Sequence, residues 1–103
     1  MSISREVKES KLLQGADEKI AYQLTTTPWG STPTSIVVKC YDVTTAREDV
    51  TSTNLSGTAS ATGDVITCPV LQSLTAGNSY RLEIQFVAGG NTWEAYAIIQ
   101  AED

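Results

Sequence analysis

The chain of 103 residues contains no histidine, so it lacks the commonest general base and the commonest metal ligand among protein side chains. Its two cysteines, Cys40 and Cys68, cannot complete a tetrahedral zinc shell without histidine or a second cysteine pair. No imidazole is present to activate a cysteine or serine nucleophile. We therefore expect no catalytic residue, no metal site and no bound cofactor, and an enzymatic function is the most remote one for this chain.

Basic side chains are also scarce, with 7 Lys and Arg against 12 Asp and Glu and a net charge of -5. Residues 1–20 hold four basic and four acidic groups, so residues 21–103 hold three basic and eight acidic ones. Nucleic-acid binding draws its affinity from clustered Lys and Arg. The acidic body of the chain therefore excludes nucleic acid as a main partner.

Long apolar runs are missing as well, and none approaches the roughly 18 residues of a membrane-spanning helix. The first residues, MSISRE, lead into alternating charges instead of the apolar core of a secretory signal. We expect a soluble chain that stays in the cytoplasm where it is made, unless a leader was removed earlier. Its length fits a single domain over residues 1–103.

What the sequence has in quantity is Ser and Thr, 24 residues together, and short β-branched and aromatic runs between Gly, Pro, Asn and Asp. This pattern is typical of strands and turns. It predicts seven strands, at residues 6–13, 20–24, 35–43, 49–54, 64–70, 80–86 and 92–100. The first is expected at a sheet edge, although Ile3 and Val7 have helical spacing and leave a helix over residues 3–13 as an alternative.

Alternation along two of these strands predicts which side chains face the core. Residues 35–43 place Ile36, Val38 and Cys40 on one face and Val37, Lys39 and Tyr41 on a wetter one. Residues 80–86 place Tyr80, Leu82, Ile84 and Phe86 against Arg81, Glu83 and Gln85. Residues 88–91, Ala-Gly-Gly-Asn, tolerate positive φ and predict a hairpin into the last strand.

Several residues were weighed for chemistry. Cys40 and Cys68 fall on inward faces, which favours buried free thiols. Glu48 and Asp49, with Asp42 nearby, form the closest carboxylate cluster, but a flexible polar segment lacks the rigid facing geometry of a glycosidase. The glycine pair 89–90 joins two strands and opens no helix, so it offers no phosphate site.

Aromatic residues allow two interpretations. Trp29, Trp93, Tyr41 and Tyr96 would suit a stacking platform for sugar rings, or they would serve core and cross-strand packing. Trp29 lies between Pro28 and Gly30 in a loop over residues 25–34 that must leave the sheet ladder. There it either caps the end of a sandwich or protrudes as an anchor.

A contact surface is expected at the last strand or on its neighbouring face. Lys8, Glu9 and Lys11 would blunt the first strand, whereas residues 93–99 carry a single charge among apolar residues. The candidate surface consists of Trp93, Tyr96 and Ile98, with Trp29 as a second anchor, for self-association or docking of a protein partner. The alternative is that the same residues only close the core.

The spacing of Leu74, Gly77 and Tyr80 resembles the tyrosine corner of immunoglobulin-like and fibronectin type III domains, in which the Tyr ties down the preceding connection. The resemblance implies an all-β fold, an antiparallel seven-stranded immunoglobulin-like sandwich. Two features depart from the family pattern. The expected core Trp lies in a Pro-rich loop, and the two cysteines lack the spacing of the antibody-domain disulfide.

Taken whole, the chain resembles small phage and prophage structural proteins with an immunoglobulin-like sandwich. The similar parts are residues 22–24, 27–31, 36–42 and 74–86 with the closing hairpin. The resemblance implies a non-enzymatic virion or tail-associated component, made without a leader in the bacterial cytoplasm and assembled into the virion by protein contacts. The alternative is a carbohydrate-binding or adhesive accessory module of a larger secreted protein, which the Ser and Thr content and the aromatics also fit.

Overall fold

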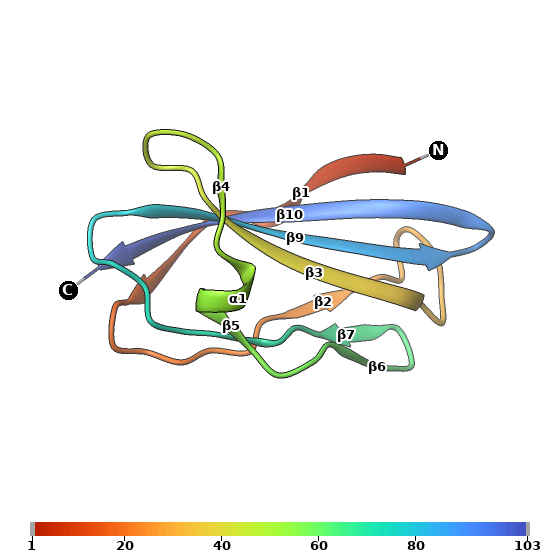
Figure 1. The fold of residues 1–103 in the computed structure, drawn as a ribbon. Coiled ribbons are helices and arrows are strands. Elements are labelled where there is room, and N and C mark those ends of the chain that lie inside the picture. The colour runs from red at the N-terminus through yellow and green to blue at the C-terminus, as the bar shows by residue number, and fades with distance from the viewer. Residues whose placement is uncertain (1, 103) are drawn as a thin grey trace.

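Two layers of β-strands make up the computed structural model, which describes the backbone of residues 2–102 and the side chains of residues 12–102 (Figure 1). Over these residues the elements are β1 (Ser2–Gly15), β2 (Gln23–Thr25), β3 (Thr34–Asp42), β4 (Glu48–Asp49), α1 (Thr51–Asn54), β5 (Leu55–Ser56), β6 (Ser60–Thr62), β7 (Val65–Thr67), β8 (Val70–Leu71), β9 (Ser79–Ala88) and β10 (Asn91–Glu102). One layer is a five-stranded sheet of order β1-β10-β9-β3-β4. The other contains the sheet β2-β7-β6 and the pair β5-β8.

The strand pairing confirms an all-β protein but corrects the expectation of a wholly antiparallel one. β1 runs parallel to β10, whereas the other strand pairs are antiparallel. Parallel neighbours need a long crossover connection, and here nearly the whole chain lies between the two strands. Alternation along a single strand carries no information about the direction of its partner.

β1 lies at the edge of the five-stranded sheet, as expected for residues 6–13, and the helical alternative over residues 3–13 is wrong. The strand is longer than expected, at 14 residues. Its ladder with β10 is interrupted between Glu6 and Lys11, where it carries extra residues. The side chains of Lys8, Glu9 and Lys11 lie outside the described residues, so their expected blunting of this edge stays a prediction.

The predicted terminal hairpin is confirmed. β9 and β10 pair from Ala88 and Asn91 onward, with Gly89 (φ 60°) and Gly90 (φ 80°) between them. Two consecutive residues with positive φ make the tight turn whose twist matches antiparallel strands, and Gly adopts this conformation without a Cβ clash. β10 is paired on both sides, with β9 and with β1, so the expected contact at the last strand cannot use a free strand edge there.

The core fills the space between the layers with the side chains that alternation assigned to it. Tyr80, Leu82, Ile84 and Phe86 of β9 are buried, and Ala95, Ala97 and Ile99 face them from β10. Cys40 and Cys68 are also buried in this core. Small residues on β10 leave room for the large side chains of β9 and of the opposite layer, notably Ile66 and Leu71.

The segment 49–54, expected as a strand, is instead the end of β4 followed by the single helical turn α1. Asp49 Oδ1 accepts a hydrogen bond from the Thr51 N–H at 3.0 Å, and this local bond turns the chain out of the ladder. Thr51 Oγ1 then accepts from the Cys40 N–H at 3.0 Å. The Thr51 side chain therefore accepts the hydrogen bond of a β3 backbone N–H that would otherwise have paired with a full fourth strand.

Tyr80 makes a hydrogen bond of the kind that the resemblance to a tyrosine corner implies. Its buried hydroxyl accepts a hydrogen bond from the Thr75 N–H at 2.9 Å, five residues upstream. Leu74 is buried beneath the connection, and Gly77 (φ 90°) donates its N–H to the Ala101 carbonyl at 3.0 Å. The connection between β8 and β9 is thus tied both to the core and to the end of β10.

Candidate functional site

The two cysteines are buried thiols in the core. Both are buried and free, and burial raises the pKa of each thiol to about 12. Asp42 and Asp49 raise the pKa of Cys40 further by their negative charge. Because the thiolate is the reactive form, neither side chain serves as a nucleophile in the folded protein.

The carboxylate cluster at residues 42–49 is engaged in turns. Asp42 accepts hydrogen bonds from the Thr44 N–H and hydroxyl and from Asn78 Nδ2. Burial opposes ionisation of Asp42, but these bonds outweigh it and lower its pKa. Hydrogen bonds from Thr51 likewise lower the pKa of Asp49. Two carboxylates held ionised by local bonds do not form the acid and base pair of a glycosidase.

Among the described side chains, no three His, Cys, Asp or Glu residues are grouped as a metal site would require. Helices of the length and apolar character needed to cross a membrane are likewise not found in the described residues.

The four residues of the expected contact surface do not lie together. Trp93 belongs to the inward-facing row of β10, packs against the core and donates its indole N–H to the Ala88 carbonyl at 3.1 Å. Tyr96 and Ile98 alternate with it and belong to the opposite, outward row. Any partner that contacts Tyr96 therefore approaches from the side of the sheet away from Trp93.

Trp29 turns inward as well. Its ring lies 5.8 Å from that of Phe86, centroid to centroid, and the side chain packs against the core. The loop that carries it is fixed by Thr26, whose hydroxyl donates to the Gly30 carbonyl at 2.9 Å. Of the two interpretations for Trp29, the structure supports the cap at the end of the core.

The outward side chains of β3, β9 and β10 form a surface that we call the outer face. Cross-strand neighbours define its rows: Val37, Gln85 and Glu94 in the first, Lys39, Glu83 and Tyr96 in the second, and Tyr41, Arg81 and Ile98 in the third. Val37 is 45% exposed, one of the most exposed large apolar side chains among the described residues. Two members of the expected contact surface, Tyr96 and Ile98, lie on this face.

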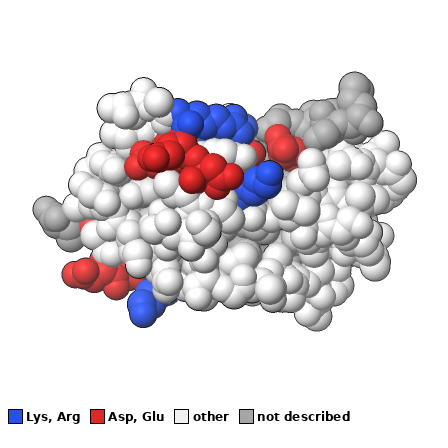
Figure 2. Space-filling model, in the orientation of Figure 1, with Lys and Arg blue, Asp and Glu red and all other residues white. Residues whose placement is uncertain are grey.

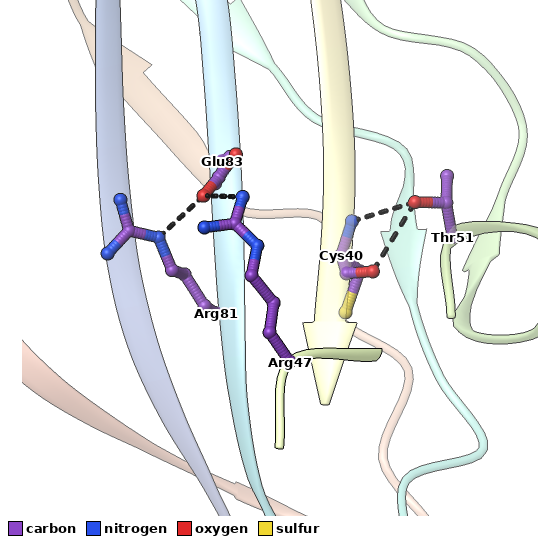
Figure 3. Close-up of polar contacts among 5 residues, drawn as sticks. All are labelled: Cys40, Arg47, Thr51, Arg81 and Glu83. Atoms are coloured by element: carbon purple, nitrogen blue, oxygen red, sulfur yellow. Dashed lines mark hydrogen bonds and ion pairs between the residues drawn. The ribbon is translucent and has the colours of Figure 1, made fainter. Parts of the chain in front are cut away.

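Glu83 is the centre of the outer face. Although it points away from the core, the residue is only 7% exposed, because two arginines cover it (Figure 3). Arg81 Nε and Arg47 Nη2 lie 2.6 Å and 2.9 Å from the same oxygen, Glu83 Oε2. A nearly buried carboxylate paired with two guanidinium groups is rigidly held by charge-assisted hydrogen bonds.

Each arginine also lies over a tyrosine ring. The Arg47 guanidinium is 4.1 Å from the centroid of Tyr41, and that of Arg81 is 3.7 Å from the centroid of Tyr96. A hydrogen bond to Tyr41 and the charge of Glu83 raise the pKa of Arg47 above its already high value. Stacking and ion pairing together fix the positions of two long, otherwise flexible side chains.

These side chains enclose a hollow of about 330 Å³ on the surface, the Glu83 hollow, lined by Val37, Lys39, Tyr41, Arg47, Arg81, Glu83, Gln85 and Glu94. Figure 2 shows charged side chains of both signs gathered over the five-stranded layer. On the same view the surface over β2, β6 and β7 is almost free of charge. On this face of the molecule most charged side chains therefore lie over the five-stranded layer, and a second, smaller group lies at the lower left.

Alternation along the sequence assigned Lys39, Arg81 and Glu83 to outward faces, but it did not group them. Arg47 was missed, because it lies in the turn between β3 and β4, where periodicity carries no information. The feature of the sequence that could have pointed to Arg47 is the small number of basic residues after residue 20. Residues 21–103 contain three basic side chains, and all three lie around Glu83.

Comparisons of the chain with protein-family models, with curated proteins and with solved structures find no match.

Proposed function

We propose that the chain is an immunoglobulin-like sandwich that serves as a non-enzymatic structural or assembly component of a phage or prophage particle, acting through protein contacts. Two observations support the immunoglobulin-like fold. β3, β9 and β10 are adjacent in one sheet and β2, β7 and β6 in the other, and these six strands have the order of the C-F-G and B-E-D strands of such sandwiches. Tyr80 makes the hydrogen bond of a tyrosine corner.

The outer face carries the proposal of a contact role. Tyr and Arg are the residue types enriched at the energetic centres of protein interfaces. Here Arg47 and Arg81 are stacked on Tyr41 and Tyr96, beside the exposed Val37 and around a fixed carboxylate. A partner that binds this face meets preformed side chains and orders few of them on binding, which favours affinity.

Docking onto a different protein is favoured over self-association. The chain carries a net charge of -5, and like net charge keeps copies of one protein apart. The association with a virion or tail rests on the resemblance in residues 22–24, 27–31, 36–42 and 74–86 with the closing hairpin.

The alternative of a carbohydrate-binding module receives no support from the aromatic residues. Trp29 and Trp93 face the core, and arginines cover the rings of Tyr41 and Tyr96. A sugar ring stacks on an open aromatic face. The expected platform is therefore not formed by these four side chains.

The test is incorporation into particles. An epitope-tagged chain is expressed in the bacterium that carries its gene, phage production is induced, and particles are purified on a density gradient and probed for the tag. We expect the wild type in the particle fractions and a strong loss for Tyr96→Glu, with Ser60→Glu on the exposed strand β6 as the control. Absence of the wild type from intact particles contradicts the proposed function.

A further inference from the structure

The basic side chains of the body are collected at one place. Residues 21–103 contain three of them, Lys39, Arg47 and Arg81, and all three line the Glu83 hollow. With Glu83 and Glu94, the hollow has three positive and two negative groups and a net charge of +1, whereas residues 21–103 as a whole have three and eight, a net of -5. Asp49, the β4 neighbour of Tyr41, adds one negative charge close to Lys39 and brings the local balance to about zero. The hollow is therefore much less acidic than residues 21–103 as a whole, and it gathers all of their cations.

Because salt screens distant charges, the charges close to the hollow determine the electrostatic potential inside it. At physiological ionic strength the Debye length is about 8 Å, so exposed charges farther away contribute little to the potential in the hollow. A group that enters it is attracted by the nearby cations. Acidic groups on distant loops of the same molecule hardly oppose this attraction, and the nearby acids that do oppose it are Glu83, Glu94 and Asp49.

The cations are also positioned for a ligand. Arg47 uses Nη2 to contact Glu83, yet its side chain remains 56% exposed, and Lys39 is exposed beside it. A guanidinium has five N–H donors in a planar fork that matches a carboxylate. The stacking of Arg47 on Tyr41 holds this fork in place before any ligand arrives.

We infer that the Glu83 hollow binds an acidic segment of a partner protein, with an Asp or Glu side chain placed against Arg47 and Lys39. The apolar Val37 at the rim would contact the aliphatic part of the same segment. This inference rests on the proposed contact role of the outer face and names the chemistry of the partner.

The probe is an acetylated and amidated pentapeptide of glycine, glutamate, aspartate, glutamate and glycine, titrated into ¹⁵N-labelled protein at about 0.15 M salt. Its control is the same peptide with glutamine and asparagine in place of the acids. We expect amide shifts confined to β3, β9, β10 and the turn that carries Arg47. The indole signals of Trp29 and Trp93, which lie on the core side, should not move.

Matched variants assign the binding to named groups. Lys39→Gln and Arg47→Gln should each weaken binding by about threefold, the effect of one partly exposed charge pair. Lys19→Gln removes an equal charge at an exposed position in another part of the chain and should leave the affinity unchanged. Glu94→Gln removes a negative group from the hollow and should tighten binding about twofold.

Several results overturn the inference. One is that the amide peptide binds as tightly as the acidic peptide. Another is that Lys19→Gln weakens binding as much as Lys39→Gln or Arg47→Gln does. A third is that no amide signal shifts at about 10 mM peptide, a concentration beyond the range of specific contacts. Sodium acetate that binds as tightly as the peptide would show that no segment is recognised. A dimer of the wild type that Arg47→Gln dissolves would assign the hollow to a second copy.

The same variants separate this inference from the proposed function. If the wild type enters particles and Tyr96→Glu does not, but the peptide fails to bind, the contact role stands and the acidic partner is wrong. If the peptide binds as described and the chain is absent from particles, the hollow is a binding site in some other assembly and the phage role is wrong.

Discussion

Among single residues, Tyr80 has the most clearly defined structural role. Its hydroxyl is the partner of the Thr75 N–H in the connection before β9, and this bond is part-buried because Tyr80 is buried while Thr75 is exposed. Loss of this part-buried hydrogen bond costs about 1 to 2 kcal/mol. The hydrogen bond of the Tyr80 hydroxyl therefore contributes a large fraction of the free energy of unfolding of a small domain.

We predict that Tyr80→Phe lowers the free energy of unfolding by about 1 to 2 kcal/mol in urea titrations. Tyr96→Phe is the control, since it also removes a phenolic hydroxyl but leaves the ring beneath Arg81, and should change stability by less than about 0.5 kcal/mol. Equal stability of wild type and Tyr80→Phe would remove the tyrosine corner from the account of the fold.

The buried thiols lead to a second prediction. Because burial raises the pKa of Cys40 and Cys68 to about 12, we expect a thiol reagent at pH 8 to label the native protein only very slowly. Two thiols per chain should react at once in denaturant. Rapid labelling of the native state, or an unreduced mass two units below that of the dithiol, would contradict this.

The raised pKa values of the same thiols also make the free energy of unfolding depend on pH. Their folded-state pKa lies above the ordinary value of 9.0, so their contribution to stability is complete below about pH 9 and is lost as the pH rises towards about 12. We expect the free energy of unfolding to fall over this window. Cys68→Ala should show a shallower fall than the wild type when both are measured by urea titration.

At the level of elements, the loop between β2 and β3 is held against the terminal hairpin by a glycine. A Cβ on Gly30 would lie 2.8 Å from Ala88 Cβ and 3.0 Å from the Ala88 carbonyl carbon. The backbone of Gly30 has φ 154°, a conformation that L residues rarely adopt. The close approach lets Trp29 reach Phe86 and cover the end of the core.

We predict that Gly30→Ala destabilises the domain by about 2 to 4 kcal/mol, the sum of backbone strain and a steric clash. Gly57→Ala is the matched control. Gly57 also has positive φ, 93°, but no atom lies within 4 Å of its added Cβ, so only the strain of about 1 kcal/mol applies. Similar losses in the two variants would show that the approach to Ala88 is unimportant. Tryptophan fluorescence should shift in Gly30→Ala alone.

For the whole molecule, net charge and the outer face decide how it associates. We predict that the wild type remains monomeric in sedimentation velocity up to about millimolar concentration, where only weak contacts would form. The outer face then remains available to a different protein. A concentration-dependent dimer that Tyr96→Glu abolishes and Ser60→Glu preserves would favour self-association instead.

Much of this fold could be predicted from the sequence, because alternation is a local property. The inward rows of β3 and β9, the Gly89–Gly90 hairpin and the buried cysteines follow from the spacing of side chains within a few residues, and the hydrogen bond of Tyr80 agrees with what the resemblance to a tyrosine corner implies. Each requires only that the chain bury its apolar row and that a glycine permit positive φ.

Tertiary structure decided what depends on residues far apart in the chain. The parallel pairing of β1 with β10 joins the two ends of the sequence and covers the edge that a local pattern left open. Trp29, in the loop between β2 and β3, is turned away from the outer face because it packs on Phe86, which lies far along the chain. Arg47, Arg81 and Glu83 meet because the β3–β4 turn folds over β9, and Coulomb attraction acts through space without regard to sequence distance.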